Sequence, residues 1–249
     1  MLQLLSMKTT KSLYRELKDV WQILPPAWNH RIRRAPVVGR ILELIARVTV
    51  KSASHQEIYD KRYNNFLEAA TRASTGPMAA TIARIFKPNS VVDVGCGTGA
   101  LLAQLKQDGL EVTGLEYSDA GIARCRERGV PVSKFDLETQ EAIPGKWDVT
   151  VSFEVAEHLP EPLADNYVRV ISQFSPVVIM SAATVGQGGK DHVNEQPHEY
   201  WIEKMRRRGF DYDQQTSQQV RVEWAGRGVA PWYANNTMIF RRRIEQVPE

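Results

Sequence analysis

Apolar residues are spaced differently in the first and second parts of this chain. Up to about residue 90 they recur at helical spacing, as in LYRELKDVWQIL at residues 13–24, which the pair Pro25 and Pro26 ends. A second helix is predicted in VVGRILELIARVTV at residues 37–50, and a third at residues 78–86. The first part of the chain is therefore predicted to be helical.

From Ser90 onward, short apolar runs alternate with amphipathic segments. SVVDV at residues 90–94 is a continuous apolar run, of the kind that is buried on both faces of a parallel sheet. Further strands are predicted in LEVTGLEYS, PVSKFDLE, WDVTVSFE and PVVIMSAA, and near residues 210–215 and 237–244. Helices are predicted in ALLAQLKQDG, DAGIARCRERG, EPLADNYVRVISQF and PHEYWIEKMRRRGF. This alternation predicts an α/β fold with an open, doubly wound sheet.

Length and charge divide the chain in two. Its 249 residues suffice for one domain with a modest appendage, which predicts a helical extension or lid at residues 1–64 and the α/β domain at residues 65–249. Residues 1–64 hold 12 Lys and Arg against 5 Asp and Glu, so they carry +7 of a total net charge of +3. This excess is too small to predict a nucleic-acid partner, and no recognition motif accompanies it.

The composition also indicates a compartment. We find no apolar run of the roughly 20 residues that a membrane helix needs, and no secretory signal at the start. The segment at residues 37–50 is amphipathic and would allow weak peripheral association with lipid, although such helices more often pack on their own protein. Cys96 and Cys125 have no metal-type spacing. We therefore expect a cytoplasmic protein.

A glycine-rich turn, GCGTGA at residues 95–100, follows the first predicted strand. In a doubly wound sheet this turn is the usual place for a nucleotide-like cofactor. The glycines alone fit both a dinucleotide and S-adenosylmethionine. Asp93 favours S-adenosylmethionine, because a carboxylate there would repel a pyrophosphate but suits a ligand with an ammonium and a sulfonium. Glu116, about twenty residues further on, is placed to accept both ribose hydroxyls, and Asp136 and Leu137 are placed for the adenine.

Taken together, DVGCGTG, Glu116, FDLE and SFEVAEHLP resemble the class I S-adenosylmethionine-dependent methyltransferases, of the small-molecule type. The resemblance covers residues 90–210 and implies a seven-stranded sheet whose last strand is antiparallel. It also implies a set of cofactor-binding residues: Asp93, Gly95, Cys96, Gly97, Gly99, Glu116, Tyr117, Asp136, Leu137, Phe153 and Glu154.

Two histidines are candidates for catalysis. His158 follows the fourth predicted strand, and His192 lies in the glycine-rich loop after the fifth. If the methyl acceptor is a hydroxyl, a base of this kind accelerates the transfer. His198 is expected to be structural. Asn194, Glu195 and Gln196 offer polar groups that can fix a small-molecule substrate. Trp201, Trp224, Trp232 and Tyr233 can line a substrate pocket, but core positions are the more common use of such residues.

Several alternatives stay open. The spacing of Glu154, Glu157 and His158 resembles that of methyltransferases in which carboxylates and histidines hold a divalent ion, here Mg²⁺ with His192 as fourth ligand. Other candidate functions are a nicotinamide-dependent oxidoreductase, a methyltransferase acting on a lipid- or carrier-bound acceptor, and a non-catalytic adaptor. The identity of the acceptor and the oligomeric state do not follow from the sequence.

Overall fold

The computed structural model describes residues 61–139 and 143–243, with side chains from residue 71 onward. The helices predicted at residues 13–24 and 37–50 lie outside these residues. The predicted boundary between residues 64 and 65 falls within the first described helix, α5 (Lys61–Phe86), so the division into an extension and an α/β domain stays a prediction.

A seven-stranded sheet forms the centre of the domain. Its spatial order is β3-β2-β1-β4-β5-β7-β6, and the first five strands are parallel. Strand β7 is antiparallel to both of its neighbours, β5 and β6. This confirms the predicted doubly wound α/β sheet with an antiparallel last strand. The strands are β1 (Ser90–Val94), β2 (Glu111–Glu116), β3 (Val132–Lys134), β4 (Val149–Phe153), β5 (Val177–Ser181), β6 (Phe210–Tyr212) and β7 (Met238–Arg242).

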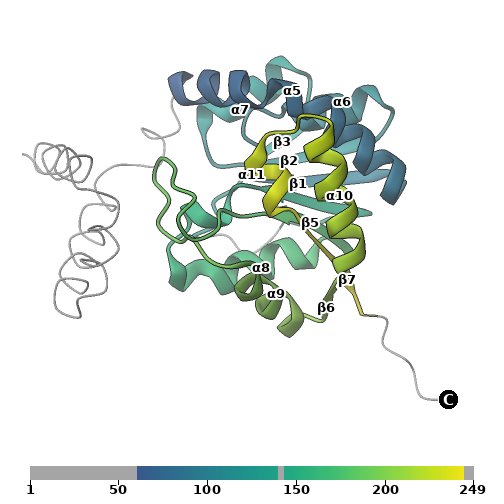
Figure 1. Ribbon diagram of the computed structural model, residues 1–249. Coiled ribbons are helices and arrows are strands. Elements are labelled where there is room, and N and C mark those ends of the chain that lie inside the picture. The colour runs from purple at the N-terminus through teal and green to yellow at the C-terminus, as the bar shows by residue number, and fades with distance from the viewer. Residues whose placement is uncertain (1–60, 140–142, 244–249) are drawn as a thin grey trace, which may run out of the picture. The chain divides into compact units, whose positions relative to one another are not determined.

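Helices cover both faces of the sheet (Figure 1). On one face, α5, α6 (Ala100–Gln107), α7 (Asp119–Glu127) and α10 (Gln214–Gly226) contribute to a single apolar cluster with β1 and β4. On the other face, α8 (Ala164–Gln173) and α9 (His198–Arg207) contribute to a second cluster. The remaining helices are short: η1 (Ala156–His158), η2 (Glu161–Leu163) and α11 (Pro231–Asn236). Within the described residues, no helix is long and apolar enough to span a membrane.

The core explains why the central strands read as continuous apolar runs. Val91, Val92 and Val94 of β1 are fully buried, because helices pack on both sides of the strand. Trp201 and Trp224 are also fully buried, as predicted for core residues, whereas Trp232 and Tyr233 of α11 are half-buried.

A buried chain of hydroxyls ties α8 to the two central strands. The Tyr167 hydroxyl donates to Ser152 Oγ at 2.9 Å, and Ser152 Oγ donates to the Val94 carbonyl at 2.7 Å. Burial raises the pKa of Tyr167, so the phenol stays protonated as a donor. These bonds support the end of β1, from which the glycine turn begins.

The substitution Tyr167→Phe is expected to lower the free energy of unfolding by about 0.5–1.5 kcal/mol, because it deletes one buried hydrogen bond and leaves the ring in place. Urea denaturation measures this change. Tyr212→Phe, in a half-buried tyrosine of the same core, is the control. Equal stability of Tyr167→Phe and the wild-type protein would show that the hydroxyl chain contributes nothing.

Two features of the fold differ from the prediction. The helix predicted at residues 78–86 begins at Lys61 and continues through Pro77, although proline removes one helical hydrogen bond. Met78, Ala79 and Ile82 bury this helix against the sheet, and that packing outweighs the lost bond. Helices α10 and α11 were not predicted, because α10 is rich in polar residues and α11 has only six.

Candidate active site

The glycine turn joins β1 to α6 at the carboxyl edge of the sheet. Gly95, Gly97 and Gly99 all have positive φ, at 79°, 55° and 69°. A Cβ on Gly95 would lie 2.5 Å from Val155 Cγ2, and a Cβ on Gly99 would lie 2.7 Å from Cys125 Sγ. At Gly97 a Cβ would meet no atom within 4 Å. The outer glycines therefore allow close packing, and the middle one faces open space.

Two buried carboxyl groups flank this turn. Asp93 is 5% exposed and Glu116 is 9% exposed. Glu116 Oε2 accepts a hydrogen bond from Gly97 N and Oε1 accepts one from Ser118 N, both at 2.7 Å. Burial raises the pKa of Glu116 to about 7, against the effect of the bonds from Ser118 and Gly97. Burial, together with the nearby Glu116, raises the pKa of Asp93 to about 8.

The Asp93 side chain is therefore not a fixed negative charge. At neutral pH most Asp93 side chains are protonated in the ligand-free protein, because the pKa of this group lies near 8. Asp93 therefore repels a pyrophosphate less strongly than a permanently ionised carboxylate would. A cation arriving beside Asp93 favours the ionised form, so the selectivity for a cationic ligand develops as that ligand binds.

Four other predicted cofactor residues lie in the turn and after β2 and β3. Asp136 Oδ1 accepts from Glu138 N at 2.8 Å, and the Leu137 carbonyl accepts from Asn166 Nδ2 at 2.7 Å. Lys134 Nζ lies 5.9 Å from the centroid of the Tyr117 ring. Cys96 Sγ lies 3.7 Å from Cys125 Sγ in α7, so its thiol is turned toward the protein. Strand β3 ends at Lys134, before Asp136, which places this acid on a loop.

The end of β4 carries the last two predicted cofactor residues. The Phe153 ring packs against the rings of Trp224 and Tyr233, each at 5.9 Å between centroids. Glu154 has a positive φ of 53°, which is uncommon for a residue with a side chain. Its Oε2 accepts from Gln187 Nε2 at 3.1 Å, and burial raises its pKa.

Glu157, His158 and His192 form a cluster between β4 and the loop that follows β5. One ligand-type atom of each lies within 4.8 Å of the other two. The two imidazole rings meet edge to face, with 5.0 Å between centroids. The Glu157 side chain is fully buried, and among the described residues neither of its oxygens has a hydrogen-bond partner. Burial and the nearby Glu154 raise the pKa of Glu157 well above its usual value. Glu154, the other acid of the predicted ligand set, does not belong to this three-residue cluster.

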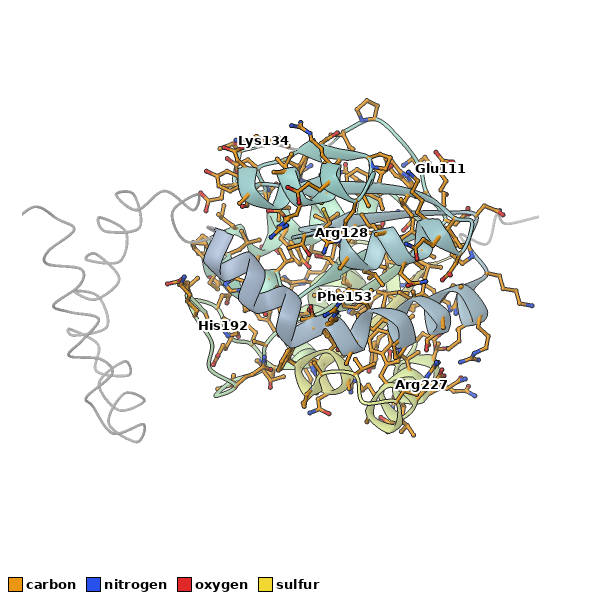
Figure 2. The ribbon with its side chains drawn as sticks, turned by 90° about the horizontal axis from the view of Figure 1, so that it is seen from above. Glu111, Arg128, Lys134, Phe153, His192 and Arg227 are labelled. Carbon is orange, nitrogen blue, oxygen red and sulfur yellow. The ribbon has the colours of Figure 1, made fainter. Side chains whose placement is uncertain are left out.

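The cluster lies on the cofactor side of the domain. Figure 2 shows His192 on the same side as Lys134, the last residue of β3, and on the opposite side from Glu111, the first residue of β2. The carboxyl ends of the parallel strands therefore face His192. Val155, which lies between Glu154 and the cluster, packs on Gly95 of the turn.

Hydrogen bonds hold His192 and its loop in place. The Glu157 carbonyl accepts from Val193 N at 2.9 Å and from Asn194 N at 3.1 Å, which joins the loop to η1. His192 Nδ1 lies 3.0 Å from Glu195 Oε1. From the sequence, Glu195 was expected only to contact the substrate. Its position three residues after His192 was the one signal for a contact between the two side chains. His198 lies outside the cluster, with its Nδ1 3.3 Å from Arg221 Nη2, as expected for a structural residue.

Comparison with known proteins adds three findings. Residues 66–176 match the family model of a methyltransferase domain. The chain is 38% identical over 80 residues to the ubiquinone biosynthesis O-methyltransferase of Pseudomonas paraeruginosa, a match that covers 29% of this chain and 34% of that protein. The chain thus spans about a third of the length of that curated relative.

Solved structures share the fold at low sequence identity. The sugar N-methyltransferase KedS8 from Streptoalloteichus superposes with a TM-score of 0.58 at 14% identity, over 74% of this chain and 94% of that one. The magnesium protoporphyrin IX methyltransferase of Synechocystis, with bound SAH, gives a TM-score of 0.53 at 16% identity, over 72% and 88%. The family match identifies residues 66–176 as a methyltransferase domain, and the strand order and the solved neighbours show the fold of the class I S-adenosylmethionine-dependent methyltransferases.

Proposed function

We propose that this protein binds S-adenosylmethionine at the glycine turn and transfers its methyl group to a hydroxyl of a small molecule. The observation that carries the proposal is the open space at Gly97 between two buried acids, Asp93 and Glu116. Open space beside a left-handed glycine lets a ligand approach the backbone closely. Buried acids suit a ligand that brings positive charge and hydroxyl donors.

The residues of the turn fit this cofactor. Each Glu116 oxygen accepts one backbone N–H and keeps further acceptor capacity, which suits the two hydroxyls of a ribose. Asp93 would face the methionine part, and Asp136 and Leu137 the adenine. When bound, the cofactor supplies a methyl group on a sulfonium, which is a good leaving group. The other proposed cofactor contacts are Gly95, Cys96, Gly97, Gly99, Tyr117, Phe153 and Glu154.

We assign the histidine cluster to the methyl acceptor. Holding the acceptor in line beside the cofactor contributes about 7–11 kcal/mol to rate acceleration in well-oriented reactions. His192, with His158 beside it, would take the proton of the acceptor hydroxyl as the new oxygen–carbon bond forms. The name of the Pseudomonas relative supports an oxygen acceptor, although the structural neighbour KedS8 is an N-methyltransferase. The two free cysteines are consistent with a place in the cytoplasm.

Binding of S-adenosylmethionine is expected to release protons and to tighten as the pH rises from 6 to 8. The reason is that the pKa of Asp93 is about 8 in the free protein, and the cofactor's cationic groups lower it on binding. Calorimetry in two buffers of different ionisation enthalpy measures the released protons. Asp93→Asn is the matched control, because it keeps the shape and cannot titrate. Affinity that is independent of pH in the wild-type protein would contradict this account.

The same titrations test the proposed function against its main alternative. Tight binding of NAD(H), with no heat from S-adenosylmethionine or its demethylated product, would replace the methyltransferase by the nicotinamide-dependent oxidoreductase. Cofactor binding without any labelled product from cell-extract metabolites would favour the non-catalytic adaptor. Labelling only of lipid- or carrier-bound acceptors would replace the small-molecule substrate.

A second candidate mode of action uses a divalent ion at Glu157, His158 and His192. The specific observation that favours it is the fully buried Glu157 carboxyl group beside two imidazoles, with a ligand-type atom of each residue within 4.8 Å of the other two. Such an ion would lower the pKa of the acceptor hydroxyl. Oxygen ligands suit Mg²⁺, but two imidazole nitrogens favour a transition-metal ion over it.

Metal binding has its own expected result. If the cluster holds an ion, Mn²⁺ or Zn²⁺ binds with a stoichiometry near one per chain and more tightly than Mg²⁺, because of the two imidazoles. Calorimetry on the wild-type protein and on Glu157→Gln measures this difference. Full methyl transfer in excess chelator would contradict the metal hypothesis. The histidines would then act directly on the acceptor hydroxyl.

A further inference from the structure

Glu195 has three partners in the loop after β5. Its Oε2 accepts from Gly186 N at 2.9 Å, and its Oε1 accepts from Gly188 N at 2.7 Å. Its Oε1 also lies 3.0 Å from His192 Nδ1. The side chains are mostly shielded from water, with 11% of His192 and 20% of Glu195 exposed. The carboxylate therefore closes the loop on itself and reaches His192 at the same time.

The loop also leaves room for the imidazole. A Cβ on Gly189 would lie only 2.3 Å from His192 Nε2 and 2.4 Å from Cε1. Any side chain at this position would collide with the ring in its present place. Gly189 thus provides the space in which the His192 ring lies, and Glu195 fixes the ring from its Nδ1 side.

This geometry determines which ring nitrogen carries the proton. An ionised carboxylate only accepts hydrogen bonds, so Nδ1 of a neutral His192 is the donor to Glu195. Nε2 then keeps its lone pair. His158 is oriented in a similar way, since its Nδ1 lies 3.4 Å from the Asp191 carbonyl.

We propose that Glu195 is the positioning residue of His192: it fixes the imidazole in the Nδ1–H form, with Nε2 available to the acceptor hydroxyl. The effect of Glu195 on turnover rests on the proposed function, whereas its effect on the tautomer of the His192 ring does not. In the transfer, the hydroxyl oxygen would bond to the methyl carbon while the methyl–sulfur bond breaks and leaves its electron pair on sulfur, and the hydroxyl proton would move to Nε2. The imidazolium formed then donates its Nδ1–H to Glu195, which stays ionised and takes no proton itself.

Nitrogen-15 NMR of the histidine side chains tests this assignment without any substrate. The wild-type protein is treated with chelator and measured at a pH above the range in which histidines are protonated. Under these conditions the His192 signals should report the Nδ1–H tautomer. In Glu195→Leu the Nδ1–H fraction should fall, because leucine has no acceptor atom, whereas in Glu195→Gln it should fall less, because the amide oxygen can still accept. The variant His192→Asn assigns the signals. Retention of the full Nδ1–H form in folded Glu195→Leu would overturn the proposal.

A second readout keeps the test decisive if Glu195→Leu fails to fold. Glu195→Gln keeps the size of the side chain and an oxygen for the loop glycines. It should lower kcat about 10–100-fold, with the affinity for S-adenosylmethionine unchanged, as for other residues that orient a functional histidine. Glu199→Gln removes an equivalent charge from the exposed first turn of α9 and is the matched control. If Glu195→Gln has the kcat of the wild-type protein, Glu195 has no positioning role. The proposed function would still stand in that case, because cofactor binding and methyl transfer both occur.

Discussion

His192→Ala is expected to lower the rate of methyl transfer by about 10²–10⁴-fold, the range typical for loss of a general base. The affinity for S-adenosylmethionine should stay within a factor of about two, because His192 is not among the proposed cofactor contacts. The rate is measured by transfer of a tritiated methyl group to the acceptor that a screen of cell-extract metabolites identifies. A large loss of rate at constant affinity would place His192 on the acceptor side.

The matched control for this experiment is His198→Gln. His198 is a half-buried histidine six residues away, and it contacts Arg221 instead of the cluster. Its replacement should leave turnover close to that of the wild-type protein. If His192→Ala turns over at the wild-type rate, His192 has no part in the reaction, and His158 would have to be tested alone.

Gly97→Ala is expected to weaken the binding of S-adenosylmethionine by about 10–100-fold, which corresponds to the 1–3 kcal/mol typical of overpacking. A methyl group there meets no protein atom within 4 Å, so it would occupy the space assigned to the cofactor. Calorimetry with the cofactor and with its demethylated product measures the loss.

Gly109→Ala separates this effect from backbone strain. Gly109 also has a positive φ, 92°, and a Cβ there would likewise meet nothing within 4 Å, but it lies at the end of α6. Both substitutions should therefore destabilise the fold to a similar extent, and only Gly97→Ala should weaken binding. Equal cofactor affinity in the two variants would mean that the cofactor does not lie over Gly97.

The sequence predicted the fold correctly where the local residue pattern and the tertiary packing agree. The central strands β1, β4 and β5 could be predicted because helices bury them on both faces, which leaves runs such as VVDV almost free of polar residues. The glycine turn could be predicted because glycines mark backbone of positive φ. The prediction was wrong about the start of α5, since Pro77 normally limits a helix and only packing on the sheet reveals that it does not.

The candidate site was predictable residue by residue but not in its electrostatics. Asp93 and Glu116 were found from their places near the ends of apolar strands, whereas the raised pKa of Asp93 depends on burial and on its distance from Glu116. The contact between Glu195 and His192 depends on how the loop folds around Gly186 and Gly188, and spacing alone gives no such geometry. The metal hypothesis placed Glu154 with Glu157, and the two acids do lie close together. Glu154 also contacts Gln187, and it is not part of the cluster of Glu157, His158 and His192.

The antiparallel direction of β7 has a practical consequence for work with this protein. Because Arg241 pairs with Val177 at the start of β5, the backbone leaves the sheet at the amino edge, far from the glycine turn. A fluorophore or surface linker attached at the exposed position 243, directly after this strand, would therefore stand clear of a ligand at the glycine turn. Immobilised protein prepared in this way should remain open to both cofactor and acceptor.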